Sequence, residues 1–149
     1  MITADEHDDE MRRPLGLILL AGLYLFFFLL SASTFGHPFP FLGHIFTGTA
    51  AKALVMADSL ACLYLFMGVF KRQLLTWYLL LAYNLFEIIN TIINLSLIST
   101  SELEKVLGER VDQEALIVNN IASALAILLL TQYIYRHKYF FTNRQNYLF

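Results

Sequence analysis

Four long apolar runs constrain the fold of this chain more than any other feature of its sequence. They cover residues 14–33, 50–70, 74–98 and 115–135. A helix that crosses the hydrocarbon core of a bilayer needs about 20 mainly apolar residues, so each run is long enough to span a membrane. The sequence therefore predicts an all-α integral membrane protein, with a four-helix transmembrane bundle that forms a single membrane domain.

The composition agrees with lipid as the surrounding medium. Of the 149 residues, 58% are hydrophobic and 15% are charged, and a soluble domain with that balance would lack polar side chains to cover its surface. The formal net charge is −2, and the basic residues stand at the ends of the apolar runs instead of forming a patch. This distribution argues against a nucleic-acid partner and favours membrane lipid.

The first apolar run is expected to remain in the protein as a span. The segment before it is rich in aspartate and glutamate, whereas a signal peptide begins with a basic segment. The run is also longer than the core of a signal peptide, which has about 7–15 residues.

Lysine and arginine predict the orientation of the spans, because these residues are enriched in cytoplasmic loops. Seven of them flank one side and three flank the other: Arg12, Arg13, Lys71, Arg72, Arg136, Lys138 and Arg144 against Lys52, Lys105 and Arg110. We therefore expect a multi-pass protein of the cell membrane, inner or plasma, with both ends cytoplasmic. The acidic tail 1–13 and the basic and aromatic tail 136–149 would lie on that side.

Two longer loops connect the spans on the opposite side. Residues 34–48 contain Pro38, Pro40 and several glycines, which exclude a long helix, and phenylalanines that are costly in water. This loop is expected to lie on the membrane surface or to fold back onto the bundle. Residues 101–114 open with Ser-Glu-Leu-Glu, which predicts a capping box at Ser101, and place Leu103 and Val106 on one face. A short amphipathic helix is predicted in this third loop.

Two carboxylates lie inside the spans, Asp58 in the second and Glu87 in the third. A charged group at bilayer depth costs at least about 2.5–3.5 kcal/mol, so it normally faces the bundle interior or a water-filled cavity and marks a functional site. In the third span Tyr83, Glu87, Asn90 and Asn94 are spaced by four, three and four residues. That spacing puts them on one face of a helix.

The same polar residues predict an outward-facing pocket. With a rise of about 1.5 Å per residue, Asp58, Glu87, Asn90, Asn94, Asn119 and Asn120 all fall in the half of the spans away from the cytoplasm. If the two carboxylates meet, repulsion between them favours a proton on one. The alternative is structural: asparagines and acids in membrane helices often only hydrogen-bond across the bundle.

Metal and cofactor sites are not predicted. His37 and His44 are the only candidate metal ligands in the first loop, but two prolines separate them and no third ligand is evident. Cys62 is the single cysteine and stands in an apolar run, which is typical of a small core residue. No nucleophile and base pair, phosphate loop or cofactor motif is recognisable.

Three functions are compatible with these features. The first is a non-enzymatic protein that binds or transports a small polar or cationic solute through the pocket. As a homo-oligomer it would have room for a complete pathway. The second is an accessory or assembly subunit of a larger membrane complex. The third is a membrane enzyme that acts on a lipid-soluble substrate, with the carboxylates as acid and base.

Overall fold

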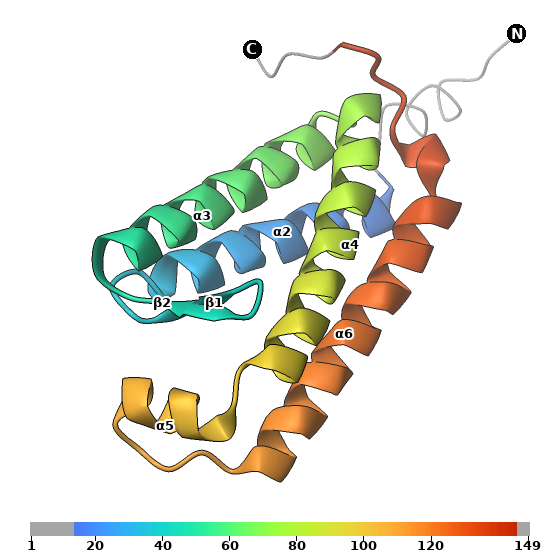
Figure 1. Ribbon diagram of the computed structural model, residues 1–149. Coiled ribbons are helices and arrows are strands. Elements are labelled where there is room, and N and C mark those ends of the chain that lie inside the picture. Colours follow the sequence, from blue (N-terminus) through green and yellow to red (C-terminus); the bar gives the residue numbers. More distant parts are fainter. Residues whose placement is uncertain (1–13, 146–149) are drawn as a thin grey trace, which may run out of the picture.

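The computed structural model describes residues 14–145 (Figure 1). Its elements, in chain order, are α2 (Leu15–Ser33), β1 (Phe39–Phe41), β2 (His44–Phe46), α3 (Gly48–Phe70), α4 (Leu74–Leu97), α5 (Thr100–Leu107), α6 (Gln113–Arg136) and the short 3₁₀ helix η1 (Lys138–Phe140). The predicted tail 1–13 and the last four residues of the C-terminal tail lie outside the described residues.

The four apolar runs are confirmed as helices. α2, α3, α4 and α6 are each long and apolar enough to cross a membrane, and their bounds differ from the predicted spans by no more than two residues at either end. The chain is mainly helical, although the first loop contains a two-stranded hairpin that the all-α prediction did not include.

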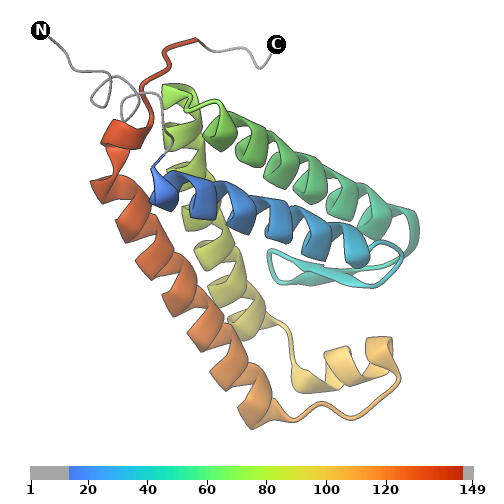
Figure 2. The ribbon, with the colours of Figure 1, turned by 180° about the vertical axis from the view of Figure 1, so that it is seen from behind.

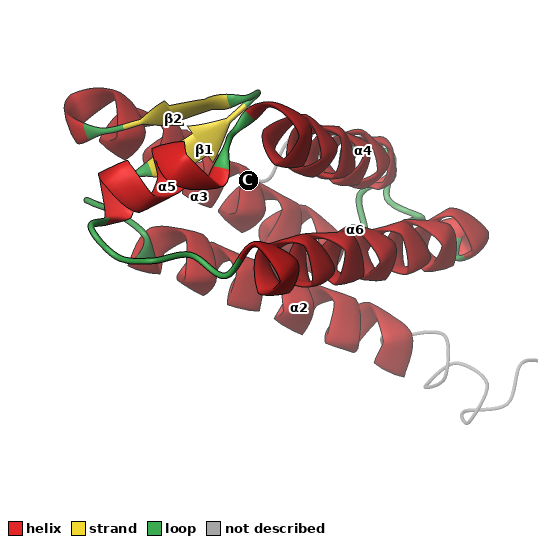
Figure 3. Ribbon diagram, turned by 60° about the horizontal axis from the view of Figure 1, so that its bottom comes forward, coloured by secondary structure: helices red, strands yellow, loops and turns green. Residues whose placement is uncertain are grey.

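The long helices are arranged as two antiparallel pairs that cross at an angle. α2 packs along α3, and α4 packs along α6 (Figure 1). The pairs meet where α3 turns into α4, which we call the terminal end because the described chain also begins and stops there. They diverge toward the opposite end (Figure 2). We call this the hairpin end, since it carries the β1–β2 hairpin and α5 (Figure 3).

The main hydrophobic core lies at the terminal end, where all four long helices contribute to one cluster. Tyr24, Leu80 and Ile134 are completely buried there, on α2, α4 and α6. Trp77 Nε1 donates a hydrogen bond to the Ile134 carbonyl oxygen at 2.9 Å. α3 approaches α4 closely at Gly68, where an added Cβ would overlap the side chain of Thr76.

The segment after α6 folds back onto this core instead of extending from it as a simple tail. Phe140 and Phe141 are buried in the terminal cluster. Asn143 exchanges backbone hydrogen bonds with the α3–α4 turn, donating to Arg72 O at 2.9 Å and accepting from Leu74 N at 2.7 Å. Arg72 Nε also donates to the Phe140 carbonyl oxygen at 2.8 Å. The C-terminal segment therefore ties the two helix pairs together.

The first loop folds back onto α4, which is one of the two positions expected for it, and forms a tight antiparallel hairpin. Phe39 pairs with Phe46 and Phe41 pairs with His44. The two turn residues between the strands, Leu42 and Gly43, have φ angles of 47° and 85°. Two consecutive positive φ angles are characteristic of a type I′ turn.

The third loop contains the predicted short helix, but its capping box begins two residues earlier than expected. Ser99 is the N-cap: its Oγ accepts from Glu102 N at 3.2 Å, and Glu102 Oε2 accepts from Ser99 N at 3.3 Å. Ser101, the predicted cap, lies inside the helix. α5 ends at Gly108 in the left-handed conformation, with φ of 73°, so the loop beyond it is not helical.

Candidate functional site

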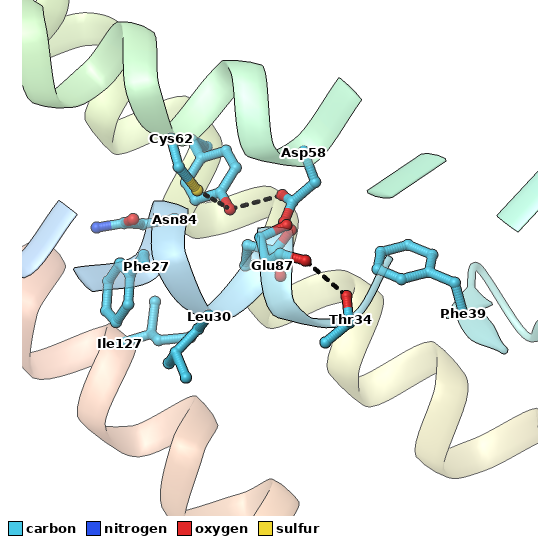
Figure 4. Close-up of a pocket in the computed structure, with 11 residues that line it drawn as sticks. Phe27, Leu30, Thr34, Phe39, Asp58, Cys62, Asn84, Glu87 and Ile127 are labelled. Carbon is cyan, nitrogen blue, oxygen red and sulfur yellow. Dashed lines mark hydrogen bonds between the residues drawn. The ribbon is translucent and has the colours of Figure 1, made fainter. Parts of the chain in front are cut away.

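A cavity of about 280 Å³ lies between the two helix pairs, on the hairpin side of the terminal core. All four long helices and β1 contribute to its lining. Asp58 from α3 and Glu87 from α4 both line it (Figure 4). The two acids that the sequence singled out therefore share one cavity, together with Tyr83.

The Asp58 carboxylate is held by hydroxyl groups from two other helices. Ser31 on α2 donates to Oδ2 at 2.6 Å, and Tyr83 on α4 donates to Oδ1 at 2.7 Å. Ser59, next to Asp58 on α3, donates in turn to the Ser31 hydroxyl at 3.1 Å. Each oxygen of Asp58 thus accepts one hydrogen bond, and three helices meet at this carboxylate.

The Glu87 carboxylate is in a different situation. It lies one helical turn beyond Tyr83 and is partly buried in the cavity wall. Within residues 14–145 no donor forms a hydrogen bond or an ion pair with it. None of the described residues that line the cavity is basic. Glu87 is therefore a carboxyl group with which no side chain of the described structure pairs.

Two further polar side chains continue the site toward the terminal core. The Cys62 thiol lies 3.2 Å from the Tyr83 hydroxyl. Because that hydroxyl donates its proton to Asp58, the thiol is the donor here. Asn84 accepts from the Tyr24 hydroxyl at 2.6 Å, while its Nδ2 is buried with no hydrogen-bond partner among residues 14–145. Figure 4 shows this nitrogen directed away from Asp58 and Glu87, so it does not bind either carboxylate.

Asn90 and Asn94 continue the polar face of α4, but they hold the hairpin instead of lining the cavity. Asn90 Oδ1 accepts from Leu42 N and Asn94 Oδ1 accepts from Gly43 N, both at 2.8 Å. These bonds fix the turn against α4. β1 is positioned by them, and Phe39 of β1 reaches the cavity wall. The sequence predicted Asn90 and Asn94 as ligand-binding residues of the pocket, whereas in the structure their side-chain oxygens position the hairpin.

Asn119 and Asn120 on α6 do not line the cavity either. The Asn119 side chain is exposed on the outside of α6. Asn120 Nδ2 donates to the Leu116 carbonyl oxygen of its own helix at 2.7 Å. Their expected depth was similar to that of the acids, but depth along a helix does not specify which way a side chain points. The residue of α6 that faces the cavity is the apolar Ile127.

Ser31 and Thr34 at the end of α2 were not predicted as site residues, and Cys62 was predicted only as a small apolar residue. Ser31 provides the shortest hydrogen bond to Asp58, and Thr34 lines the cavity. A hydroxyl near the end of a span is common and has no special spacing. The only sequence signal was that residues 31–34 are the first polar stretch of α2 and lie toward the same end as Asp58 and Glu87.

The described residues form no recognisable metal centre. Across residues 14–145, no group of three or more histidine, cysteine, aspartate or glutamate side chains is arranged to hold an ion. His37 and His44 are both exposed. His44 packs edge-on against Phe46 within the hairpin, with ring centroids 6.4 Å apart.

Fold and cavity together define a class of protein: small, mainly helical, with four helices suited to crossing a membrane and an acidic cavity between them. No family model, curated protein sequence or solved structure matches this chain. Its function has to be inferred from the cavity itself.

Proposed function

We propose that this chain is a multi-pass membrane protein, a four-helix transmembrane bundle, that binds a small cationic solute in the cavity between its helices. The observation that carries the proposal is the Glu87 carboxylate, which lines the cavity with no hydrogen-bond donor or basic side chain opposite it among the described residues. A cation in the cavity would supply the missing counter-charge.

The position of Glu87 within a membrane-spanning helix makes its charged form unfavourable. A carboxylate between membrane helices costs several kcal/mol unless it is paired or solvated. Asp58 reduces that cost with two charge-assisted hydrogen bonds, which are the strong kind. Glu87 has none, and the nearby Asp58 charge adds to the unfavourable energy. A bound cation relieves both effects, so binding energy is concentrated at Glu87.

The packing favours binding over passage across the membrane. Beyond the cavity, the terminal core is closed by Tyr24, Leu80 and Ile134, each with no exposed surface. A solute in the cavity would have to displace these side chains to reach the other end. We therefore propose a binding site that opens toward the hairpin end, away from the cytoplasm, with both chain termini on the cytoplasmic side.

A hydrophobic carbodiimide provides the test, because it enters lipid and labels carboxyl groups there. The full chain in lipid nanodiscs should be labelled at Glu87 more readily than at Asp58, whose oxygens are both hydrogen-bonded. Choline chloride, potassium chloride and sodium chloride are then added separately, and labelling is followed by peptide mass spectrometry. At least one of these cations should slow the labelling of Glu87.

The amide variants Glu87→Gln and Asp58→Asn separate function from structure. Both keep the side-chain shape, and neutral amides are cheaper to bury than acids, so the variants should insert and melt like the parent protein or slightly higher. Glu87→Gln should remove the cation-sensitive labelling. Glu109→Gln, at an exposed acid outside the cavity, is the matched control and should change nothing. If none of the three cations protects Glu87, the cavity is not a cation site and the accessory-subunit function moves ahead.

A further inference from the structure

We infer that the cation is a small organic ammonium group and not a metal ion, an inference that rests on the proposed function and narrows it. The cavity combines one unpaired carboxylate with aromatic and aliphatic walls. An ammonium group with alkyl substituents is the cation whose surface matches that combination.

Aromatic rings stand on several sides of the acids. Phe27 of α2 and Phe39 of β1 line the cavity on opposite sides of Glu87 in Figure 4. Tyr83 of α4 also lines it and donates its hydroxyl to Asp58. Ring faces attract cations through their quadrupole, and quaternary ammonium groups are the cations most often held in this way by aromatic cages. Leu30 and Ile127 complete the wall with aliphatic surface, which suits alkyl groups and offers nothing to a hydrated ion.

Most oxygen atoms around the cavity already take part in hydrogen bonds within the protein, and residues 14–145 hold no group of three or more acidic, histidine or cysteine side chains arranged for a metal. Calcium takes six to eight oxygen ligands, and potassium filters surround the ion with carbonyl oxygens that replace its water shell. Here Asp58 already accepts hydrogen bonds on both oxygens, and the Thr34 hydroxyl donates to the Ser31 carbonyl oxygen at 2.7 Å. Glu87 alone offers free carboxylate oxygens. An alkyl ammonium loses little hydration on entering and needs only one counter-charge.

The volume limits the size of the ligand. At about 280 Å³, the cavity lies just below the range of roughly 300–1,000 Å³ that is usual for drug-sized ligands. It has room for an ammonium head group with short substituents, of the size of choline or tetramethylammonium.

The test compares three solutes by the concentration that halves the labelling of Glu87 by the carbodiimide. Choline is the ammonium probe, potassium the metal probe, and 3,3-dimethyl-1-butanol a neutral molecule with the shape of choline. We expect choline to act at a concentration at least tenfold below that of potassium, and the neutral alcohol to have no effect. Protection by the alcohol equal to that by choline would show that shape alone is recognised and would overturn the inference.

Two ring variants test the aromatic walls. Phe27→Leu and Phe39→Leu keep apolar bulk but remove the ring face, so each should weaken choline protection by about two- to fivefold and leave potassium unaffected. Phe26→Leu is the matched control, because the Phe26 ring neighbours Phe27 on α2 but is 53% exposed outside the cavity.

The outcomes separate the two proposals. If potassium or sodium protects as well as choline, the organic ammonium inference is wrong while the cation site stands. If Phe27→Leu and Phe39→Leu bind choline as the parent protein does, the aromatic walls do not select the ligand and the inference is also wrong. Absence of protection by every cation overturns the proposed function itself.

Discussion

Asp58 and Glu87 show how two identical charges in one cavity acquire different roles from their immediate neighbours. Asp58 accepts from Ser31 and Tyr83 and so connects α2, α3 and α4. In this respect it is part of the structure, which the sequence analysis had kept as an alternative for both acids. Glu87 has no such partners within the described chain, and only this residue keeps its capacity for a ligand.

This difference predicts the effect of removing the Asp58 donors. Tyr83→Phe and Ser31→Ala each leave one carboxylate oxygen without its hydroxyl, which should lower the free energy of unfolding by about 1–3 kcal/mol. Carbodiimide labelling at Asp58 should rise toward the rate at Glu87. In an Asp58→Asn background the cost of Tyr83→Phe should shrink, because a neutral amide depends less on the donor. Equal costs in both backgrounds would mean that Tyr83 acts through packing.

The site could be predicted from the sequence only as far as one helix face allows. The spacing of Tyr83, Glu87, Asn90 and Asn94 correctly put them on one face of α4, but that face meets α2 and α3 in its first half and the hairpin in its second. Which neighbour meets which turn depends on how the two helix pairs cross. The crossing angle of the two helix pairs cannot be predicted from a single sequence. The same limit explains why Asn119 and Asn120 were expected at the pocket, whose wall they do not form, and why Ser31 was not predicted.

At the scale of elements, the long helices followed directly from the apolar runs, because their length and composition leave few alternatives in lipid. The hairpin did not. Its turn is Leu42-Gly43, whereas a type I′ turn usually has the sequence Asn-Gly or Asp-Gly. A leucine at positive φ is unfavourable alone. Here the Leu42 amide is held by Asn90, so a tertiary contact selects a turn that the local sequence does not favour.

α5 gives a sharper test of local signals, because its cap was predicted two residues too late. Ser99→Ala should destabilise α5 by about 0.5–2 kcal/mol and speed amide hydrogen exchange over residues 102–107, because the N-cap oxygen for Glu102 N is lost. Ser101→Ala, inside the helix, is the matched control and should have little effect. If the two variants exchange alike, the capping box between Ser99 and Glu102 does not determine where α5 begins.

For the whole molecule, the core lies at the terminal end of the four long helices and the cavity lies next to it, around the middle of the same helices. The terminal end is closed by buried aromatic side chains and by the C-terminal segment, whose Asn143 pairs with the α3–α4 turn. At the hairpin end, the side chains of Asn90 and Asn94 accept hydrogen bonds from the turn of the hairpin. Membrane proteins place irregular backbone only where protein or water covers it, so the hairpin belongs at the mouth of the cavity. We expect a solute to reach the cavity from the hairpin end, where the two helix pairs diverge.

The orientation of this asymmetric molecule in the membrane is the remaining prediction, and it rests on the distribution of lysine and arginine. Single cysteines are placed at His37 and Glu109 of the hairpin end and at Gln145 of the terminal end, all exposed positions, in a Cys62→Ala background. In intact cells an impermeant thiol reagent should label the first two and leave Gln145 unlabelled until the cells are opened. His37 is preferred to Gly43, where a side chain would collide with Leu97. Labelling of Gln145 from outside would reverse the orientation and turn the cavity mouth toward the cytoplasm, where it would meet a different pool of ammonium compounds.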